Sequence, residues 1–306
     1  MRYSVIIPVY NRPDEVDELL QSLTQQSFKD FEVIVVEDGS SIPCKPVTEK
    51  YQELLDVHYY DKPNSGPGQT RNYGAERSKG EYLIILDSDC ILPEGYFLAV
   101  EEELQHEAAD AFGGPDRAHE SFTDIQKAIN YSMTSFFTTG GIRGGKKKMD
   151  KFYPRSFNMG VRREVYQALG GFSRMRFGED IDFSIRIFKG GYTCRLFPGA
   201  WVYHKRRTDF RKFFKQVHNS GIARINLYKK YPESLKLVHL LPAAFTLGVA
   251  IFLLGTPFCP YSLLPIALYA LLVCMDSTIR NRSLSTGLYA VAAAVTQLIG
   301  PCPLST

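Results

Sequence analysis

Two aspartates separated by one residue, Asp87 and Asp89, form the most distinctive chemical motif of the chain. They follow the apolar run Tyr82–Leu86, which predicts a buried strand that delivers both carboxylates to one edge of a sheet. Two carboxylates this close repel each other unless a cation lies near them. Mg²⁺ or Mn²⁺ prefers oxygen ligands and commonly joins carboxylates to substrate phosphates. The motif therefore favours a divalent-metal site over the alternative, a solvated acidic turn.

A second acidic segment, residues 37–40, ends another apolar run and contains Asp38. A carboxylate at such a strand end can accept hydrogen bonds from a nucleobase or a ribose. Asn11 and Arg12 follow the first apolar run, Tyr3–Val9, and are expected at the same edge. An ordinary strand-end turn is the alternative interpretation of both segments.

Residues 64–72 predict a turn that runs into a helix. Gly66 lets the backbone approach a ligand closely, and the amides at the helix start together with Arg71 can meet a diphosphate. No Gly-Lys-Ser/Thr follows, so the segment is not a Walker loop. An ordinary capped helix remains open.

Two further residues have types suited to catalysis. Asp180 lies at the start of a predicted helix, where a carboxylate can take a proton from an acceptor hydroxyl or simply cap the helix. His204 follows the strand-like residues 200–203 and can complete a metal site, contact phosphate or be structural.

The elements that must position these residues alternate between strand and helix over residues 1–115. This rhythm predicts a mostly parallel sheet with helices on both faces, with ligands at the carboxyl ends of the strands. The predicted strands are Tyr3–Val9, 31–36, 57–60 and Tyr82–Leu86, and the predicted helices are 14–25, 49–55 and 68–78.

Residues 116–215 are less regular and include a loop rich in Gly and Lys at 140–148. Helices are expected at 163–169 and 180–189, and a further strand of the sheet at 193–197 or 201–204. A basic amphipathic helix at 208–228 is expected to lie on a membrane surface, or to be an ordinary surface helix.

Three apolar runs follow, at 237–258, 263–275 and 284–302. The first and the third are long enough to cross a bilayer, and the second can return across it if its flanks are included. The basic residues before the first run and after the second predict cytoplasmic ends by the positive-inside rule. A buried helical hairpin in a soluble protein is the alternative.

The composition, with 44% hydrophobic and 23% charged residues, is that of a globular chain. The net charge of +3 gives no indication of a nucleic-acid partner. The six cysteines fit no zinc pattern, which indicates reduced thiols in a cytosol-facing protein. Because Pro8, Asn11 and Arg12 interrupt the first apolar run, we expect no signal peptide and a cytoplasmic globular part.

Taken in order, these motifs resemble those of the family 2 glycosyltransferases, which have the GT-A fold. The resemblance covers about residues 1–210. Residues 4–12, with Pro8, Tyr10, Asn11 and Arg12, resemble the family's first strand and loop, and 35–40 its nucleoside-binding turn, with Glu37 where Asp is usual. The other matching segments are 64–72, the Asp87-Ser88-Asp89 motif, the acceptor-side stretch that begins at Asn158, Met159 and Gly160, and the pair Glu179-Asp180.

The resemblance implies an inverting transfer in which Asp180 is the general base. A divalent metal, Mg²⁺ or Mn²⁺, would be held by Asp89, Asp87 and His204, with Asp38, Asn64, Gly66, Arg71 and Ser88 on the nucleotide-sugar side and Glu179 on the acceptor side. The donor would be a nucleotide-diphosphate sugar, UDP-linked by default, and the acceptor a saccharide or a lipid-linked hydroxyl, as in cell-surface polysaccharide or glycolipid synthesis. The absence of a Gln-x-x-Arg-Trp sequence argues against a processive synthase.

The expected layout is a nucleotide-sugar half at 1–115, an acceptor half at 116–215, an interfacial segment at 216–236 and about three transmembrane helices at 237–306. A hypothesis is that the loop at 140–148 closes over the donor. The expected location is the cytoplasmic or inner membrane, multi-pass, in contact with membrane lipid. A nucleotidyltransferase on a similar sheet and a catalytically degenerate membrane scaffold are the rival functions.

Overall fold

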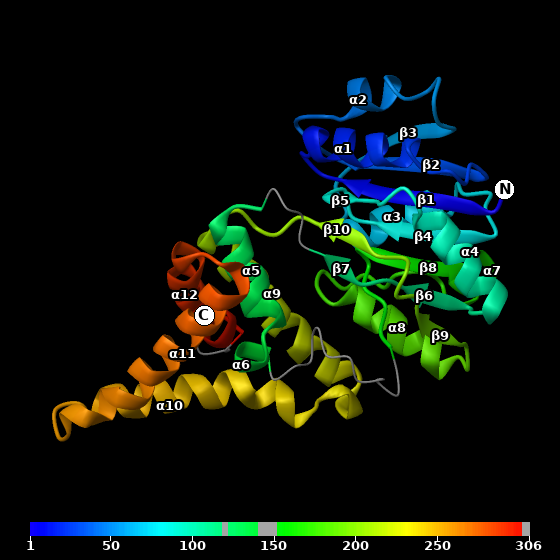
Figure 1. Ribbon diagram of the computed structural model, residues 1–306. Coiled ribbons are helices and arrows are strands. Elements are labelled where there is room, and N and C mark those ends of the chain that lie inside the picture. Colours follow the sequence, from blue (N-terminus) through cyan, green and yellow to red (C-terminus); the bar gives the residue numbers. More distant parts are fainter. Residues whose placement is uncertain (118–121, 140–151, 302–306) are drawn as a thin grey trace. The chain divides into compact units, whose positions relative to one another are not determined.

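The computed structural model describes residues 1–117, 122–139 and 152–301 (Figure 1). The chain divides into two compact units, one of Met1–His119 with Met149–Lys205 and one of Glu120–Lys148 with Arg206–Thr306. The predicted loop at 140–148 lies outside the described residues. The functional boundaries expected near 115, 215 and 236 stay predictions.

A seven-stranded sheet forms the centre of the first unit, and Figure 1 shows its strands side by side. The pairs β1–β2, β1–β4, β2–β3 and β6–β9 are parallel, whereas β8 is antiparallel to β4 and β6. The predicted mostly parallel sheet is therefore confirmed. In spatial order the strands are β3 (Val57–Lys62), β2 (Phe31–Asp38), β1 (Tyr3–Val9), β4 (Tyr82–Leu86), β8 (Asn158–Arg162), β6 (Ala111–Gly113) and β9 (Cys194–Leu196).

A hydrophobic core covers each face of this sheet, and β1 contributes to both because its successive side chains point to opposite sides. Val5 and Ile7 belong to a core with helix α1 (Pro13–Thr24), whereas Ile6 belongs to a second core on the other face. Helix α3 (Pro67–Ala75) approaches that second face through Gly74, where a Cβ would lie 2.7 Å from Ile6. The small residue is what lets the helix lie against the sheet.

The remaining elements of the first unit place the loops around the sheet. Strands β5, β10 and β7 form a separate three-stranded sheet, so both segments weighed for a further strand are strands and only β9 joins the main sheet. The predicted helix at 49–55 is wrong, because Leu55 is its only buried residue and no apolar face exists to hold a helix. The elements are α2 (Lys45–Glu49), β5 (Cys90–Ile91), α4 (Tyr96–His106), β7 (Asp116–Arg117), α7 (Arg163–Ala168), α8 (Glu179–Lys189) and β10 (Val202–His204).

The second unit is helical in its described residues. Its core joins α5, α9, α11 and α12 through buried side chains such as Ile129, Phe213, Val273 and Ala293. Helix α5 begins with a capping box made by Thr123 and Gln126. The elements are α5 (Asp124–Thr134), α6 (Phe136–Thr139), α9 (Phe210–Lys230), η1 (Pro232–Ser234), η2 (Leu237–Leu240), α10 (Leu241–Gly255), η3 (Pro260–Leu263), α11 (Leu264–Asn281) and α12 (Leu284–Ile299).

Two stretches of this unit, Leu237–Gly255 and Tyr261–Asn281, are long and apolar enough to cross a membrane, with mean hydropathies of 2.3 and 1.8. Helix α10 has no buried residue, and its exposed apolar side chains have no protein to cover them within the described chain. Length and composition of these two helices fit a membrane anchor.

The third apolar run was expected to be long enough to cross a bilayer, and this expectation is wrong. Helix α12 has 16 residues, and three of its alanines are fully buried in the core of the unit. The helix that contains the second run, α11, is longer than the run itself. It continues through Asp276 and Arg280, which form an ion pair at 2.9 Å. Two candidate spans therefore replace the expected three.

Candidate active site

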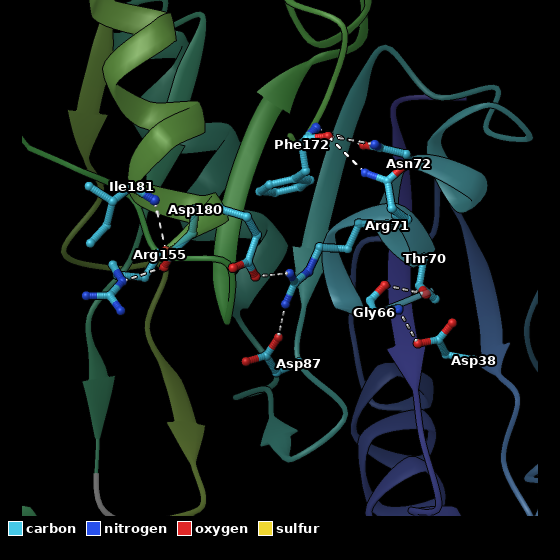
Figure 2. A network of polar contacts seen from close by, with 12 residues as sticks. Asp38, Gly66, Thr70, Arg71, Asn72, Asp87, Arg155, Phe172, Asp180 and Ile181 are labelled. Carbon is cyan, nitrogen blue, oxygen red and sulfur yellow. Dashed lines mark hydrogen bonds and ion pairs between the residues drawn. The ribbon is translucent and has the colours of Figure 1, made fainter. Parts of the chain in front are cut away.

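A buried arginine connects the carboxyl end of β4 with the start of α8 (Figure 2). Arg71 is 3% exposed, and its guanidinium donates to Asp87 Oδ1 at 2.8 Å and to Glu179 Oε1 at 3.0 Å. Burial raises the pKa of Glu179, and the charge of Arg71 only partly opposes this shift. Arg71 thus holds two of the predicted site carboxylates together. Its predicted contact with a diphosphate stays a prediction.

The second aspartate of the motif, Asp89, meets two basic groups. Arg12 Nη1 lies 2.9 Å from Asp89 Oδ2, and His204 Nε2 lies 3.2 Å from Asp89 Oδ1. The antiparallel pair β5–β10 makes this contact, because it places His204 opposite Cys90, the residue after Asp89. The structure therefore brings the predicted metal ligands Asp89 and His204 together, whereas Asp87 pairs with Arg71.

The donor atoms around Asp89 fit a divalent cation. Ligand atoms of Asp89, Cys90 and His204 all lie within 4.8 Å of one another. Burial and the neighbouring aspartates raise the pKa of the Cys90 thiol well above its ordinary value, and this thiol already donates a hydrogen bond to the Phe157 carbonyl at 3.3 Å. A carboxylate and an imidazole remain, a set that Mn²⁺ accepts more readily than the strictly oxygen-seeking Mg²⁺. Ser88, between the two aspartates, is buried.

Asp38 shapes the turn that leads into α3. Its carboxylate accepts hydrogen bonds from the backbone N–H groups of Ser65 and Gly66, both at 2.9 Å, and contacts Lys62 Nζ. Asn64 Nδ2 donates to the Asp38 carbonyl at 2.7 Å. Burial opposes ionisation, but the hydrogen bonds from Lys62 and Ser65 outweigh it and lower the pKa of Asp38. Asp38 is thus ionised and held in place, and its contact with a nucleoside stays a prediction.

The loop after β1 is joined to the loop after β2 through Asn11. This residue has a φ of 55°, and its Oδ1 accepts from the backbone N–H groups of Ser41 and Ile42 at 2.8 and 3.0 Å. Tyr10, next to it, is 54% exposed, and Pro8 lies within β1 opposite Val36 on β2. Tyr10 and Asn11 therefore follow the carboxyl end of the parallel strand β1, as expected.

An arginine that sequence reasoning missed lies against the predicted base. Arg155 Nε is 2.6 Å from Asp180 Oδ2, and the backbone N–H of Ile181 donates to Asp180 Oδ1 at 2.8 Å (Figure 2). Burial would raise the pKa of Asp180, but the charge and hydrogen bond of Arg155 lower it below its ordinary value. The acidic residues at 179–182 indicate a need for a cation, yet nothing in the irregular segment 152–157 marks Arg155 as the partner.

The three residues predicted on the acceptor side are all buried in β8. Asn158 Oδ1 accepts from Tyr96 at 2.7 Å, while Asn158 Nδ2 donates to a backbone carbonyl at 2.7 Å. Met159 is fully buried, and a Cβ on Gly160 would lie 2.1 Å from the Phe112 ring. The structure gives these residues a part in the fold, and their place on the acceptor side stays a prediction.

Residues 4–170 of the chain match the family model described as Glycosyl transferase family 2. An uncharacterized glycosyltransferase of Haemophilus influenzae is 30% identical over 193 residues, which cover 61% of this chain and 62% of that protein. The chain thus spans just under two thirds of the length of that relative.

The solved structures that resemble this fold include a mannosyltransferase and TarS. The mannosyltransferase PcManGT from Pyrobaculum calidifontis, in complex with GDP-Man and Mn²⁺, matches with a TM-score of 0.68 and 18% identity over 97% of this chain and 87% of that chain. TarS 1-349 of S. aureus, in complex with UDP-GlcNAc, matches with a TM-score of 0.51 and 20% identity over 74% of this chain and 67% of that chain. Because the family model covers more than half of the chain, this protein belongs to glycosyl transferase family 2, and it has a GT-A-like α/β fold.

Proposed function

We propose that this protein transfers a hexose, with inversion, from a nucleotide-diphosphate sugar to a hydroxyl of a saccharide or lipid-linked acceptor. The observation that carries the proposal is the bridge made by Arg71. It connects Asp87, from the motif on the nucleotide side, with Glu179, the neighbour of Asp180. One buried guanidinium thus links the aspartate proposed to face the donor to the residue that precedes Asp180, the carboxylate proposed to activate the acceptor.

Asp180 would accept the proton of the acceptor hydroxyl as its oxygen attacks the anomeric carbon. The low pKa of Asp180 keeps this carboxylate ionised at neutral pH. Its pairing with Arg155 means that the acceptor hydroxyl must compete with the guanidinium for the carboxylate. The family model ends at residue 170, so the assignment of the base depends on these contacts and on the Glu-Asp resemblance.

On the donor side, Asp89 and His204 would hold Mg²⁺ or Mn²⁺, since their ligand atoms lie close together. When bound, such a cation neutralises the negative charge that grows on a departing diphosphate. Arg12, 2.9 Å from Asp89, adds a second positive charge beside the same carboxylate. The loops that carry Tyr10, Asp38 and Gly66 would receive the nucleoside at the carboxyl ends of β1 and β2.

UDP is the proposed nucleotide. TarS, which matches the fold of this chain, is solved with UDP-GlcNAc, whereas PcManGT is solved with GDP-Man and Mn²⁺. The donor is therefore best identified by incubating the purified protein with UDP- and GDP-sugars and with Mg²⁺ or Mn²⁺, and by measuring the released nucleoside diphosphate.

We expect UDP to be released from one UDP-sugar, and we expect this release to be lost in an Asp89→Asn variant. Turnover of a nucleoside triphosphate with release of pyrophosphate would instead identify a nucleotidyltransferase. No turnover with any donor and acceptor pair, in protein that still binds nucleotide, would indicate a degenerate scaffold.

We also propose that α10 and α11 form a hairpin across the cytoplasmic or inner membrane, with the α/β unit in the cytoplasm. The basic residues Lys229, Lys230 and Lys236 precede the first span, and Arg280 and Arg282 end the second, so both ends favour the cytoplasmic side. A membrane location would bring lipid-linked acceptors within reach. Protease added to the outside of intact cells is expected to leave the α/β unit undigested. Digestion of the α/β unit under these conditions would contradict this orientation.

A further inference from the structure

We propose that Glu32, Asp56 and His58 form a second metal site, suited to Zn²⁺, at the end of the sheet opposite the candidate active site. Glu32 is the second residue of β2 and His58 the second residue of β3, so both lie at the amino ends of parallel strands. Asp38 ends β2 six residues later, which at about 3.3 Å per residue places it about 20 Å from Glu32. The site is therefore separate from the carboxylates that face the donor.

Glu32 is the residue that points to a ligand. It is fully buried, and its Oε1 accepts hydrogen bonds from Ser4 Oγ and from the backbone N–H of Lys79, both at 2.6 Å. Within the described chain, Glu32 Oε2 and the facing His58 Nε2 make no well-aligned hydrogen bond, although His58 Nε2 lies near both carboxylates. A buried carboxylate oxygen without a hydrogen bond is costly, and a bound cation would remove that cost.

The spacing of the donor atoms fits tetrahedral zinc. His58 Nε2 lies 3.1 Å from Asp56 Oδ1 and 3.7 Å from Glu32 Oε2, and the three ligand atoms all lie within 4.8 Å of one another. Zinc binds imidazole nitrogen and carboxylate oxygen at about 2.0–2.2 Å, so neighbouring ligands of a tetrahedral ion lie about 3.3–3.6 Å apart. The two measured separations lie on either side of that range.

Charge and access agree with this assignment. With a neutral imidazole, two carboxylates give the cluster a charge that Zn²⁺ would neutralise. The side chains of His58 and Asp56 are 35% and 51% exposed, so an ion can enter from solvent and keep a water as its fourth ligand. Bound zinc would tie the start of β2 to the start of β3, the edge strand of the main sheet.

The test measures zinc bound to the full chain in an Asp89→Asn background, which removes the candidate active-site ligand. After chelation, incubation with ZnCl₂ and removal of free metal, we expect one zinc per chain by elemental analysis. Asp56→Asn, a change at an exposed side chain, is expected to weaken zinc binding at least about tenfold, and His58→Gln to abolish it. Glu53→Gln, at an exposed carboxylate three residues before Asp56, is the matched control and should bind zinc as its parent does.

Two results would overturn the proposal. One is an Asp89→Asn protein that is folded by circular dichroism and binds no zinc, in which case the contacts between His58 and the two carboxylates are structural only. The other is zinc binding that Asp56→Asn and His58→Gln leave unchanged. Co²⁺ bound in place of zinc gives an independent reading, because tetrahedral coordination by these ligands should produce visible absorption that His58→Gln removes.

Discussion

The ion pair between Arg155 and Asp180 offers a direct test of the proposed base, through the substitution Arg155→Gln. A guanidinium beside a carboxylate lowers the pKa of the acid by roughly 1–3 units. The contact is short, at 2.6 Å, but 42% of the Arg155 side chain is exposed, so solvent screens its charge. Loss of Arg155 should therefore raise the pKa of Asp180, because burial, which disfavours the charged carboxylate, is then no longer opposed by this guanidinium.

The sign of the effect on activity follows from the role of the base. Asp180 accepts a proton only when it is ionised, and in the native protein its pKa lies below the ordinary value. The acidic limb of the kcat/KM profile of the native enzyme should thus lie at low pH, and in Arg155→Gln it should move to higher pH. The assay is the initial rate of nucleoside diphosphate release across the pH range, with a saturating donor and with the acceptor well below its KM.

Arg176→Gln is the matched control, because Arg176 is exposed and lies four residues before Asp180 in the chain. Its acidic limb should coincide with that of the native enzyme. An acidic limb that stays in place in Arg155→Gln would refute the reasoning, as would an equal shift in both variants.

Three further outcomes test the contacts around the site. Arg71→Gln leaves the buried Glu179 without its cation, so the free energy of unfolding, measured by urea titration, should fall by about 3–5 kcal/mol. Adding Glu179→Gln should recover part of this loss, and strictly additive losses in the double variant would contradict the bridge. Gly160→Ala places a methyl group against the buried Phe112 ring and should cost about 1–3 kcal/mol, so an unchanged melting temperature would contradict the packing. Because the pKa of Asp38 is lowered on folding, its contribution to stability is present above the unfolded-state pKa of about 3.9 and is lost as the pH falls through the folded-state value. Urea midpoints of the native protein and Asp38→Asn should therefore converge in acid, and a constant difference would contradict the assignment.

The strand ends were predictable because apolar runs mark them in the sequence. Tyr82–Leu86 is followed at once by Asp87, and the residues of β2 lead directly to Asp38, so parallel pairing alone brings these acids to one edge. The partners of the acids were not predictable in the same way. Arg71 and Arg155 are chosen by tertiary packing, and Arg155 lies in a segment without periodicity.

The C-terminal helices show a second limit of the sequence. Hydropathy identifies three apolar runs, but it does not distinguish a helix packed on its neighbours from one that faces lipid. Helix α12 is rich in alanine and buries Ala290, Ala293 and Ala294, whereas the leucines of α10 remain exposed. The length of α11 also depends on polar residues near its end, which an apolar count leaves out.

The most direct test of the central claim compares donor binding with turnover in Asp180→Asn, a change that preserves shape and removes the proposed base. We expect the variant to bind the nucleotide-sugar with Mn²⁺ at native affinity by calorimetry, while kcat falls by a factor of about 10²–10⁴. A kcat equal to that of the native enzyme would contradict the account.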